Sequence, residues 1–126
     1  MFNEISKYLD AVYVKDARTH KEVDCYGLCY LYNKEILEIE IPKYADFNID
    51  QDKFKKIKIG KEYPGDIILF DIKGYPVHVG IIIQKGVMLH IMENSKPMIE
   101  NYNGPKWEKR INSIWRYENN SKKTDI

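Results

Sequence analysis

The sequence predicts a protein of the α+β class, in which N-terminal helices pack on an antiparallel β-sheet. Apolar residues recur at helical spacing in the first third of the chain, whereas short β-branched runs separated by turn residues dominate the second half. The connections between these runs are too short for the crossovers that a parallel sheet requires. We therefore expect helices first and an antiparallel β-meander after them.

An amphipathic helix is predicted over residues 2–12, because Phe2, Ile5, Leu9 and Val12 recur at helical spacing. The polar residues that follow, KDARTHKEVD, predict a loop.

A second helix is predicted over about 25–37, with Asp24 as its N-cap. Its apolar stripe consists of Leu28, Cys29, Tyr32 and Ile36. Gly27 is a poor helix former, but it would allow another segment to approach closely.

A long irregular connection follows over residues 39–66, with a helical turn expected near 50–56. The predicted strands are DIILFDI (66–72), HVGIII (78–83), VMLHIM (87–92), PMIEN (97–101) and SIWRYE (113–118).

The second and third of these strands are expected to form a hairpin. A two-residue turn at Lys85–Gly86 would place Ile81 opposite His90, whereas a longer or bulged turn would shift the pairing toward His78.

The chain of 126 residues is long enough for one domain with one hydrophobic core. We expect this domain over residues 1–118 and a polar tail over 119–126. A formal net charge of +1, with acidic and basic residues nearly balanced, predicts no nucleic-acid partner. No apolar run approaches the length that spans a bilayer, so no membrane partner is predicted either.

The N-terminal residues lack the basic and apolar regions of a signal peptide, and we therefore expect synthesis in the cytoplasm. Cys25 and Cys29 lie one helical turn apart, where a disulfide is geometrically awkward. Free thiols are typical of a reducing compartment.

Cys25 falls in the first turn of the second predicted helix, where unpaired amide groups and the helix dipole favour an anion. This placement predicts a lowered thiol pKa and a reactive cysteine. Cys29 lies on the apolar stripe and is expected to be a core residue.

A cysteine nucleophile requires a base within hydrogen-bond reach. His78 and His90 lie on strands that are expected to be neighbours, so one could serve as base and the other could orient it. His20 lies in the polar loop and is expected to be a surface residue.

Zinc is the alternative for the four potential ligands Cys25, Cys29, His78 and His90. Structural zinc cysteines usually lie in tight turns, whereas these two lie on an apolar helix. Catalysis is therefore the favoured interpretation, with no metal and no cofactor.

Four segments resemble motifs of the NlpC-type cell-wall cysteine peptidases, a papain-like family. They are DCYGL (24–28), PGDIILF (64–70), HVGI (78–81) and VMLHIM (87–92). They occur in the family order with comfortable spacing. The resemblance implies a helical part packed on an antiparallel sheet, with the cysteine at a helix start facing the histidines.

The resemblance implies that Cys25 is the nucleophile, that His78 is the general base and that His90 orients the imidazole. It further implies that Tyr13 contributes to the oxyanion site. Tyr26 stands where the family has a serine and would reshape the substrate subsite.

Asp24 is most simply an N-cap, and binding of a substrate amine is its alternative role. A Gly-Gly stretch of the family is missing between Tyr13 and Cys25, where KDARTHKEV stands instead.

The implied substrate is the stem peptide of bacterial peptidoglycan, cleaved between γ-D-glutamate and a diamino acid. The alternatives are a non-catalytic wall-binding or tail-assembly module of the same fold, and a thiol acyltransferase that uses the same residues.

The segment GPKWEKRINSIWRY (104–117) resembles the closing segment of short phage-tail members. It implies phage-tail partners and delivery to the cell wall on a virion. Trp107 and Trp115 would equally well complete the core.

Overall fold

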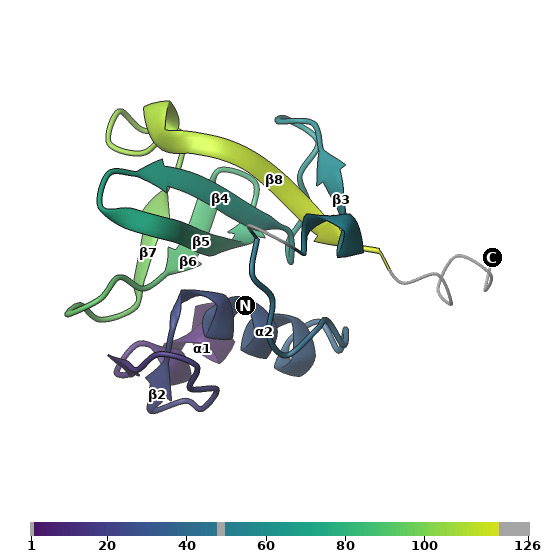
Figure 1. Ribbon diagram of the computed structural model, residues 1–126. Helices are drawn as coiled ribbons and strands as arrows, with labels where there is room; N and C mark the ends of the chain where they lie inside the picture. The colour runs from purple at the N-terminus through teal and green to yellow at the C-terminus, as the bar shows by residue number, and fades with distance from the viewer. Residues whose placement is uncertain (1, 48–49, 119–126) are drawn as a thin grey trace.

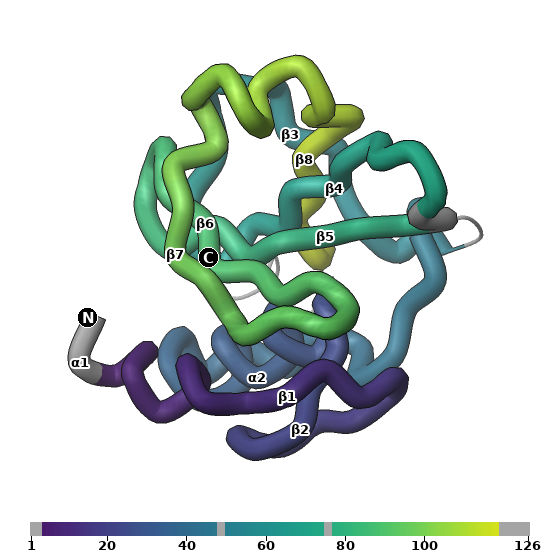
Figure 2. The backbone as a smooth tube through the Cα atoms, turned by 90° about the vertical axis from the view of Figure 1, so that its left-hand side faces the viewer, coloured from purple at the N-terminus to yellow at the C-terminus, as the bar shows by residue number. Residues whose placement is uncertain are grey.

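One helix packed on a six-stranded antiparallel sheet forms the fold, which confirms the predicted α+β class. The computed structural model describes residues 2–47 and 50–118, and the expected polar tail over 119–126 lies outside them. Figures 1 and 2 show α1, α2 and the short strands β1 and β2 together on one side of the sheet. In chain order the elements are α1 (Phe2–Ile5), η1 (Ser6–Tyr8), β1 (Val12–Tyr13), β2 (Glu22–Val23), α2 (Cys25–Glu35), η2 (Gln51–Lys53), β3 (Phe54–Ile57), β4 (Ile67–Ile72), β5 (Tyr75–Gln84), β6 (Val87–His90), β7 (Met98–Asn101), η3 (Glu108–Arg110) and β8 (Ile111–Tyr117).

The strand order in the sheet is β3-β8-β4-β5-β6-β7, and each neighbouring pair is antiparallel. Strands β4 to β7 follow one another as the predicted meander. The last strand departs from the prediction because β8 lies between β3 and β4. Its adjacent residues Ile114 and Trp115 are both buried, and they pair with Ile68 and Ile67 of β4. Apolar residues on both faces suit an interior strand better than an exposed edge.

The N-terminal helix is shorter than the one predicted over residues 2–12. Helix α1 ends at Ile5, and one 3₁₀ turn continues to Tyr8 before the chain extends into β1. The Val12 amide donates a hydrogen bond of 2.9 Å to the carbonyl of Lys21, and β1 pairs in parallel with β2. Val12 is consequently 45% exposed. Its helical spacing from the preceding apolar residues was misleading, because backbone pairing with β2 satisfies this segment instead.

Helix α2 begins where it was predicted to begin. Asp24 is its N-cap, with φ −104° and ψ −175°, and its side chain accepts a 2.8 Å hydrogen bond from the Gly27 amide. The helix ends at Glu35, two residues before the predicted end. Gly27 lets the preceding loop pack on the helix, because a Cβ there would lie 2.5 Å from Val23 Cγ2 and 2.8 Å from the carbonyl oxygen of Ala17.

The β5–β6 hairpin follows the bulged alternative rather than the simple two-residue turn. Ile81 pairs with Leu89 and not with His90, because the register shifts near the turn. A shift of one residue turns the side chains of a strand to the opposite face. His90 is thereby brought to the face of the sheet that carries His78.

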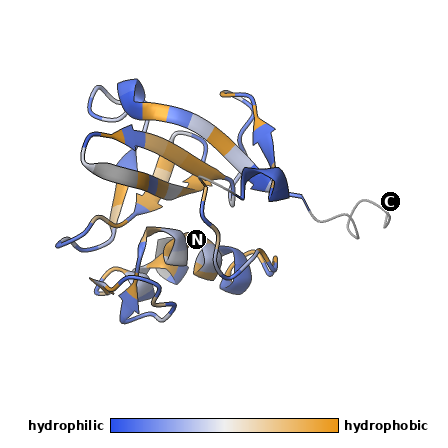
Figure 3. Ribbon diagram, in the orientation of Figure 1, coloured by the Kyte–Doolittle hydropathy of each residue, from blue (hydrophilic) through white to orange (hydrophobic). Residues whose placement is uncertain are grey.

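Hydrophobic residues recur along the strands of the sheet (Figure 3), and their buried side chains form two clusters. The larger core lies between α2 and the sheet and includes Leu28, Tyr32 and Ile81. The smaller core covers the other face and includes Phe70 and Trp107. Successive residues of a strand therefore place their side chains in different cores, one on each face of the sheet.

Asp66 holds the turn that leads into β4. Its carboxylate accepts a 2.8 Å hydrogen bond from the Tyr63 amide and two more, each of 2.8 Å, from the Arg116 guanidinium. This bidentate pair links the start of β4 to the end of β8.

Candidate active site

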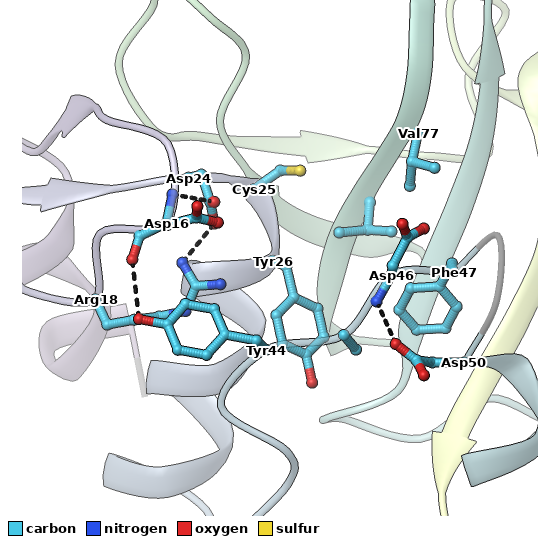
Figure 4. Close-up of a pocket in the computed structure, with 12 residues that line it drawn as sticks. Asp16, Arg18, Asp24, Cys25, Tyr26, Tyr44, Asp46, Phe47, Asp50 and Val77 are labelled. Atoms are coloured by element: carbon cyan, nitrogen blue, oxygen red, sulfur yellow. Dashed lines mark hydrogen bonds and ion pairs between the residues drawn. The ribbon is translucent and has the colours of Figure 1, made fainter.

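Cys25 lies in a pocket of about 460 Å³ at the N-terminus of α2. Figure 4 shows its side chain directed away from the helix and toward the sheet, with Val77 across the pocket. The polar residues of the wall, apart from Cys25, are Asp16, Arg18, Asp24, Tyr26, Tyr44, Asp46 and Asp50. The predicted nucleophile is therefore open to a ligand on one side.

The sulfur of Cys25 lies against the backbone of β5. The Val79 amide donates a hydrogen bond to it. The Ile82 amide points toward β4, where it meets the carbonyl of Asp66 at 2.9 Å. Because amide directions alternate along an antiparallel strand, the Val79 amide points the other way, toward β6. Strand β6 ends at His90 and does not continue alongside Val79. The thiol of Cys25 therefore takes the place of a backbone carbonyl as acceptor for the Val79 amide.

Burial raises the pKa of the Cys25 thiol to about 11, and the hydrogen bond from the Val79 amide opposes this rise only in part. The prediction that the helix terminus lowers this pKa is therefore wrong for the resting protein. Removal from water destabilises the thiolate more than the helix terminus stabilises it. The cysteine rests as a neutral thiol and must lose its proton when it attacks.

Cys25 should be alkylated by iodoacetamide far faster than Cys29, and its rate should rise about tenfold per pH unit between pH 7 and 10. Cys29 is fully buried, and burial raises its thiol pKa well above the usual value. Timed labelling followed by peptide mapping measures both rates. Equal labelling of the two cysteines would contradict the assignment, and a Cys25 rate already constant below pH 7 would indicate a thiolate at rest.

His78 and His90 form a hydrogen-bonded pair, with 3.0 Å between His78 Nε2 and His90 Nδ1. Gly80 provides the space for it, because a Cβ at this position would lie 3.2 Å from the Cβ of His90. The contact is the one expected of a residue that orients the imidazole of another.

The ring of His78 lies on the face of the sheet opposite the pocket. It packs against Phe70 and Trp107 and is completely buried, whereas the next residue, Val79, lines the pocket with Cys25. The structure thus brings the two histidines together and brings the sulfur to the backbone beside His78. Proton transfer between Cys25 and His78 stays a prediction.

Glu100 is a member of this site that the sequence did not single out. Its Oε2 lies 2.6 Å from His90 Nε2. Glu100 pairs with Met88 across β6 and β7, which places it on the same face as His90. A charged residue within the run PMIEN was the available signal, but only the register shows which face it occupies.

Both histidines are neutral at pH 7. Burial, followed by the effect of nearby His90, lowers the pKa of His78 to about 4. Burial also lowers the pKa of His90, against the opposing effect of its hydrogen bond to Glu100.

Unfolding should become easier as the pH falls from about 6.5 to about 4. In this range the unfolded chain protonates His78 while the folded chain keeps it neutral, so the proton is taken up on unfolding. The loss from this residue is about 3 kcal/mol, since each pKa unit corresponds to about 1.4 kcal/mol. Urea titrations at several pH values measure the slope. His78→Gln should flatten it and the exposed His20→Gln should not; an equal slope in His78→Gln would refute the assignment.

Asp24 acts as an N-cap whose second role is an ion pair. Its Oδ1 lies 2.7 Å from Arg18 Nη1 and its Oδ2 accepts a 2.7 Å hydrogen bond from the Asp16 amide. A substrate amine would therefore share this carboxylate with Arg18.

The two predicted tyrosines occupy different places. Tyr26 lines the pocket, and its hydroxyl donates a 2.6 Å hydrogen bond to the carbonyl of Pro42, so its ring is held as part of the wall. Tyr13 lines a second depression, beside Lys96, rather than the pocket of Cys25. Its role at the oxyanion site stays a prediction.

Within residues 2–47 and 50–118, no group of three or more His, Cys, Asp or Glu side chains is arranged to hold a metal ion. In the same part of the chain, no helix combines the length and apolar character needed to cross a membrane.

Comparison with known proteins identifies the family of this site. The NlpC/P60 family profile matches residues 10–116. The probable endopeptidase p60 of Listeria grayi is 29% identical over 111 residues, which cover 85% of this chain and 20% of that protein. The chain thus spans about a fifth of the length of this relative.

Two solved structures have the same fold. NlpC2 from Trichomonas vaginalis superposes with a TM-score of 0.69 at 25% identity, covering 91% of this chain and 44% of that chain. The NlpC/p60 domain of the peptidoglycan hydrolase SagA superposes with a TM-score of 0.66 at 17% identity, covering 93% of this chain and 95% of that domain. Because the family profile spans the chain from β1 into β8, this protein belongs to the NlpC/P60 family.

Proposed function

We propose that this protein is a cysteine peptidase that hydrolyses amide bonds in the stem peptides of peptidoglycan. The carrying observation is a cysteine at the start of α2, open to a pocket and bonded to the backbone beside a buried His–His–Glu chain. Membership of the NlpC/P60 family supports the proposal. The relative p60 is described as a probable endopeptidase and SagA as a peptidoglycan hydrolase.

In the proposed reaction, Cys25 Sγ attacks the amide carbonyl while His78 takes the thiol proton. Attack and proton transfer are coupled, because the thiol pKa of about 11 and the His78 pKa of about 4 favour the neutral pair at rest. His78 then protonates the leaving amine, and water activated by His78 hydrolyses the thioester.

The oxyanion that forms in each step requires hydrogen-bond donors. The backbone amide of Cys25, at the start of α2, points at the thiol of the same residue and is the first candidate donor. The hydroxyl of Tyr13 is the second candidate donor. One such donor is typically worth about 3 kcal/mol of transition-state stabilisation.

The charge of the pocket favours a substrate with a free amine. Its wall contains the carboxylates of Asp16, Asp46 and Asp50. Asp50 is paired with Lys53 at 3.4 Å, and the cation of the wall, Arg18, is paired with Asp24. A diamino acid next to γ-D-glutamate carries such an amine, and this bond is the one that we propose is cleaved.

Defined muropeptides test the proposal. Incubation with the disaccharide tripeptide and tetrapeptide should yield two fragments separated between γ-D-glutamate and the diamino acid, detected by mass spectrometry. Acetylating the free amine of the diamino acid removes its positive charge and should weaken cleavage if the acidic wall binds this amine. Intact muropeptides after long incubation would favour a binding module, and products joined to an added amine would favour a thiol acyltransferase.

Action at the bacterial cell wall follows from this substrate. Delivery there by a phage or prophage tail is a narrower proposal, supported by the resemblance of residues 104–117 to the closing segment of phage-tail members. Detection of the chain in purified virions by mass spectrometry would test it, and its absence from them would refute it.

A further inference from the structure

We propose that Glu100 is a positioning residue that sets the tautomers of His90 and His78 and thereby prepares His78 Nδ1 to accept the thiol proton. This inference rests on the proposed peptidase function and extends it to a residue outside the cysteine and the two histidines. It is based on a chain of hydrogen bonds that crosses three neighbouring strands, β5, β6 and β7.

The geometry of the chain is tight and largely buried. Glu100 Oε2 lies 2.6 Å from His90 Nε2, and His90 Nδ1 lies 3.0 Å from His78 Nε2. His90 is 1% exposed, His78 is 0% exposed, and the Glu100 side chain is 17% exposed. Trp107 packs edge-on against His90 at 4.9 Å between ring centroids and stacks on His78 at 6.1 Å. These contacts restrict rotation of both rings.

The chemistry of the three groups assigns each hydrogen. A carboxylate only accepts hydrogen bonds, so His90 must carry its hydrogen on Nε2 to bond Glu100. In a neutral ring the other nitrogen, Nδ1, then has a lone pair and accepts from His78 Nε2–H. The same rule leaves His78 Nδ1 without a hydrogen. Nδ1 is the ring nitrogen nearer the backbone, which is where the sulfur of Cys25 meets the Val79 amide.

Glu100 keeps its charge in this setting. Burial raises the pKa of its carboxyl, but the hydrogen bond from His90 opposes this rise, and the pKa is lowered overall. Lys106 Nζ lies 3.5 Å from Glu100 Oε1, with its side chain 63% exposed.

The Glu100 end of this series of hydrogen bonds reaches solvent. A depression of about 280 Å³ is lined by His90, Glu100, Lys106 and Trp107, among others. It lies on the face of the sheet away from the pocket of Cys25, so the carboxylate is placed to stabilise a positive charge on the histidines without contacting substrate.

Nuclear magnetic resonance of the full chain, labelled with ¹⁵N at histidine, tests the tautomers directly. Long-range ¹H–¹⁵N correlations show which ring nitrogen carries hydrogen, and His20→Ala identifies the third ring. At pH 7 we expect hydrogen on Nε2 and none on Nδ1 in both His78 and His90. Hydrogen on Nδ1 of either ring would overturn the proposal, and this result needs no measurement of activity.

Glu100→Gln tests the positioning role, because an amide can donate as readily as it accepts and no longer dictates the tautomer. We expect mixed tautomers at both histidines and a decrease in kcat of roughly 10- to 100-fold with KM little changed, by analogy with the loss of partners that orient metal-bound histidines. Glu93→Gln makes the same charge change on the same depression and should leave kcat and the tautomers as they are.

The pH dependence adds a further readout. The ionisable groups that act on the histidine pair are Glu100 from β7 and Lys106 from the segment before β8, whereas Cys25 lies at the backbone beside His78, on the other face of the sheet. Without the carboxylate, imidazolium is less stable, so the acidic limb of kcat should move to lower pH in Glu100→Gln. An unchanged kcat and an unchanged limb would overturn the positioning role. Should the wild-type chain hydrolyse no muropeptide, the proposed function fails, while the spectra and the alkylation rate of Cys25 in Glu100→Gln still decide the role of Glu100.

Discussion

Cys25→Ala is expected to reduce hydrolysis of muropeptides by at least about 10⁴-fold, to the level of the uncatalysed control. Among the residues that line the pocket, no other side chain could act as a nucleophile at the position of the sulfur. Loss of a covalent nucleophile is among the largest single effects known in enzymes, at roughly 10⁶-fold in a serine protease. Product formation is measured by chromatography and mass spectrometry over several hours.

Cys29→Ala is the matched control for this experiment. Cys29 lies one turn further along α2, fully buried, with its Sγ 3.6 Å from the carbonyl of Cys25. Its replacement should lower the free energy of unfolding by about 1 kcal/mol through a small cavity and leave kcat close to wild type. Loss of activity in Cys29→Ala with full activity in Cys25→Ala would reverse the assignment.

His78→Ala is expected to lower kcat by roughly 10²- to 10⁴-fold, because a base must carry the proton from the thiol to the leaving amine. His90→Ala should have a smaller effect, and His90→Gln should recover part of the loss, since an amide can still bond His78 Nε2. His20→Ala should have little effect on turnover, because His20 bonds Glu35 at 2.7 Å on the exposed side of the molecule.

The order of these effects distinguishes the two histidines. Steady-state kinetics on one muropeptide, together with thermal unfolding of each variant, separates lost chemistry from lost stability. A larger loss in His90→Ala than in His78→Ala, at equal folding, would mean that the two roles must be exchanged. Full activity in both would refute a catalytic role for the pair and favour the binding module.

Much of the fold follows from local sequence patterns. The N-cap at Asp24 and the start of α2 at Cys25 follow from side-chain chemistry within three residues. The strands β4 to β7 follow from β-branched runs between turn residues, and their antiparallel pairing follows from short connections. These features depend on neighbours in the chain, so the sequence alone predicts them.

The elements that were predicted wrongly depend on distant partners. Residues 9–12 have helical spacing, but pairing of β1 with β2 takes them out of the helix. The position of β8 between β3 and β4 depends on its pairing with two strands from much earlier in the chain. Neither is encoded in the spacing of residues near these segments.

The residue types of the site were visible in the sequence, but their arrangement was not. Cys25, His78 and His90 stand out because each is a reactive group in an otherwise apolar run. A shift of one residue in the β5–β6 register brings His90 to the face of His78, and the β6–β7 register adds Glu100 to them. The pKa of Cys25 was predicted in the wrong direction, because burial is a property of the packed chain. The sequence by itself therefore determined which groups are available for chemistry, whereas the tertiary structure decided which of them meet, since strand register and burial arise only when distant segments pack together.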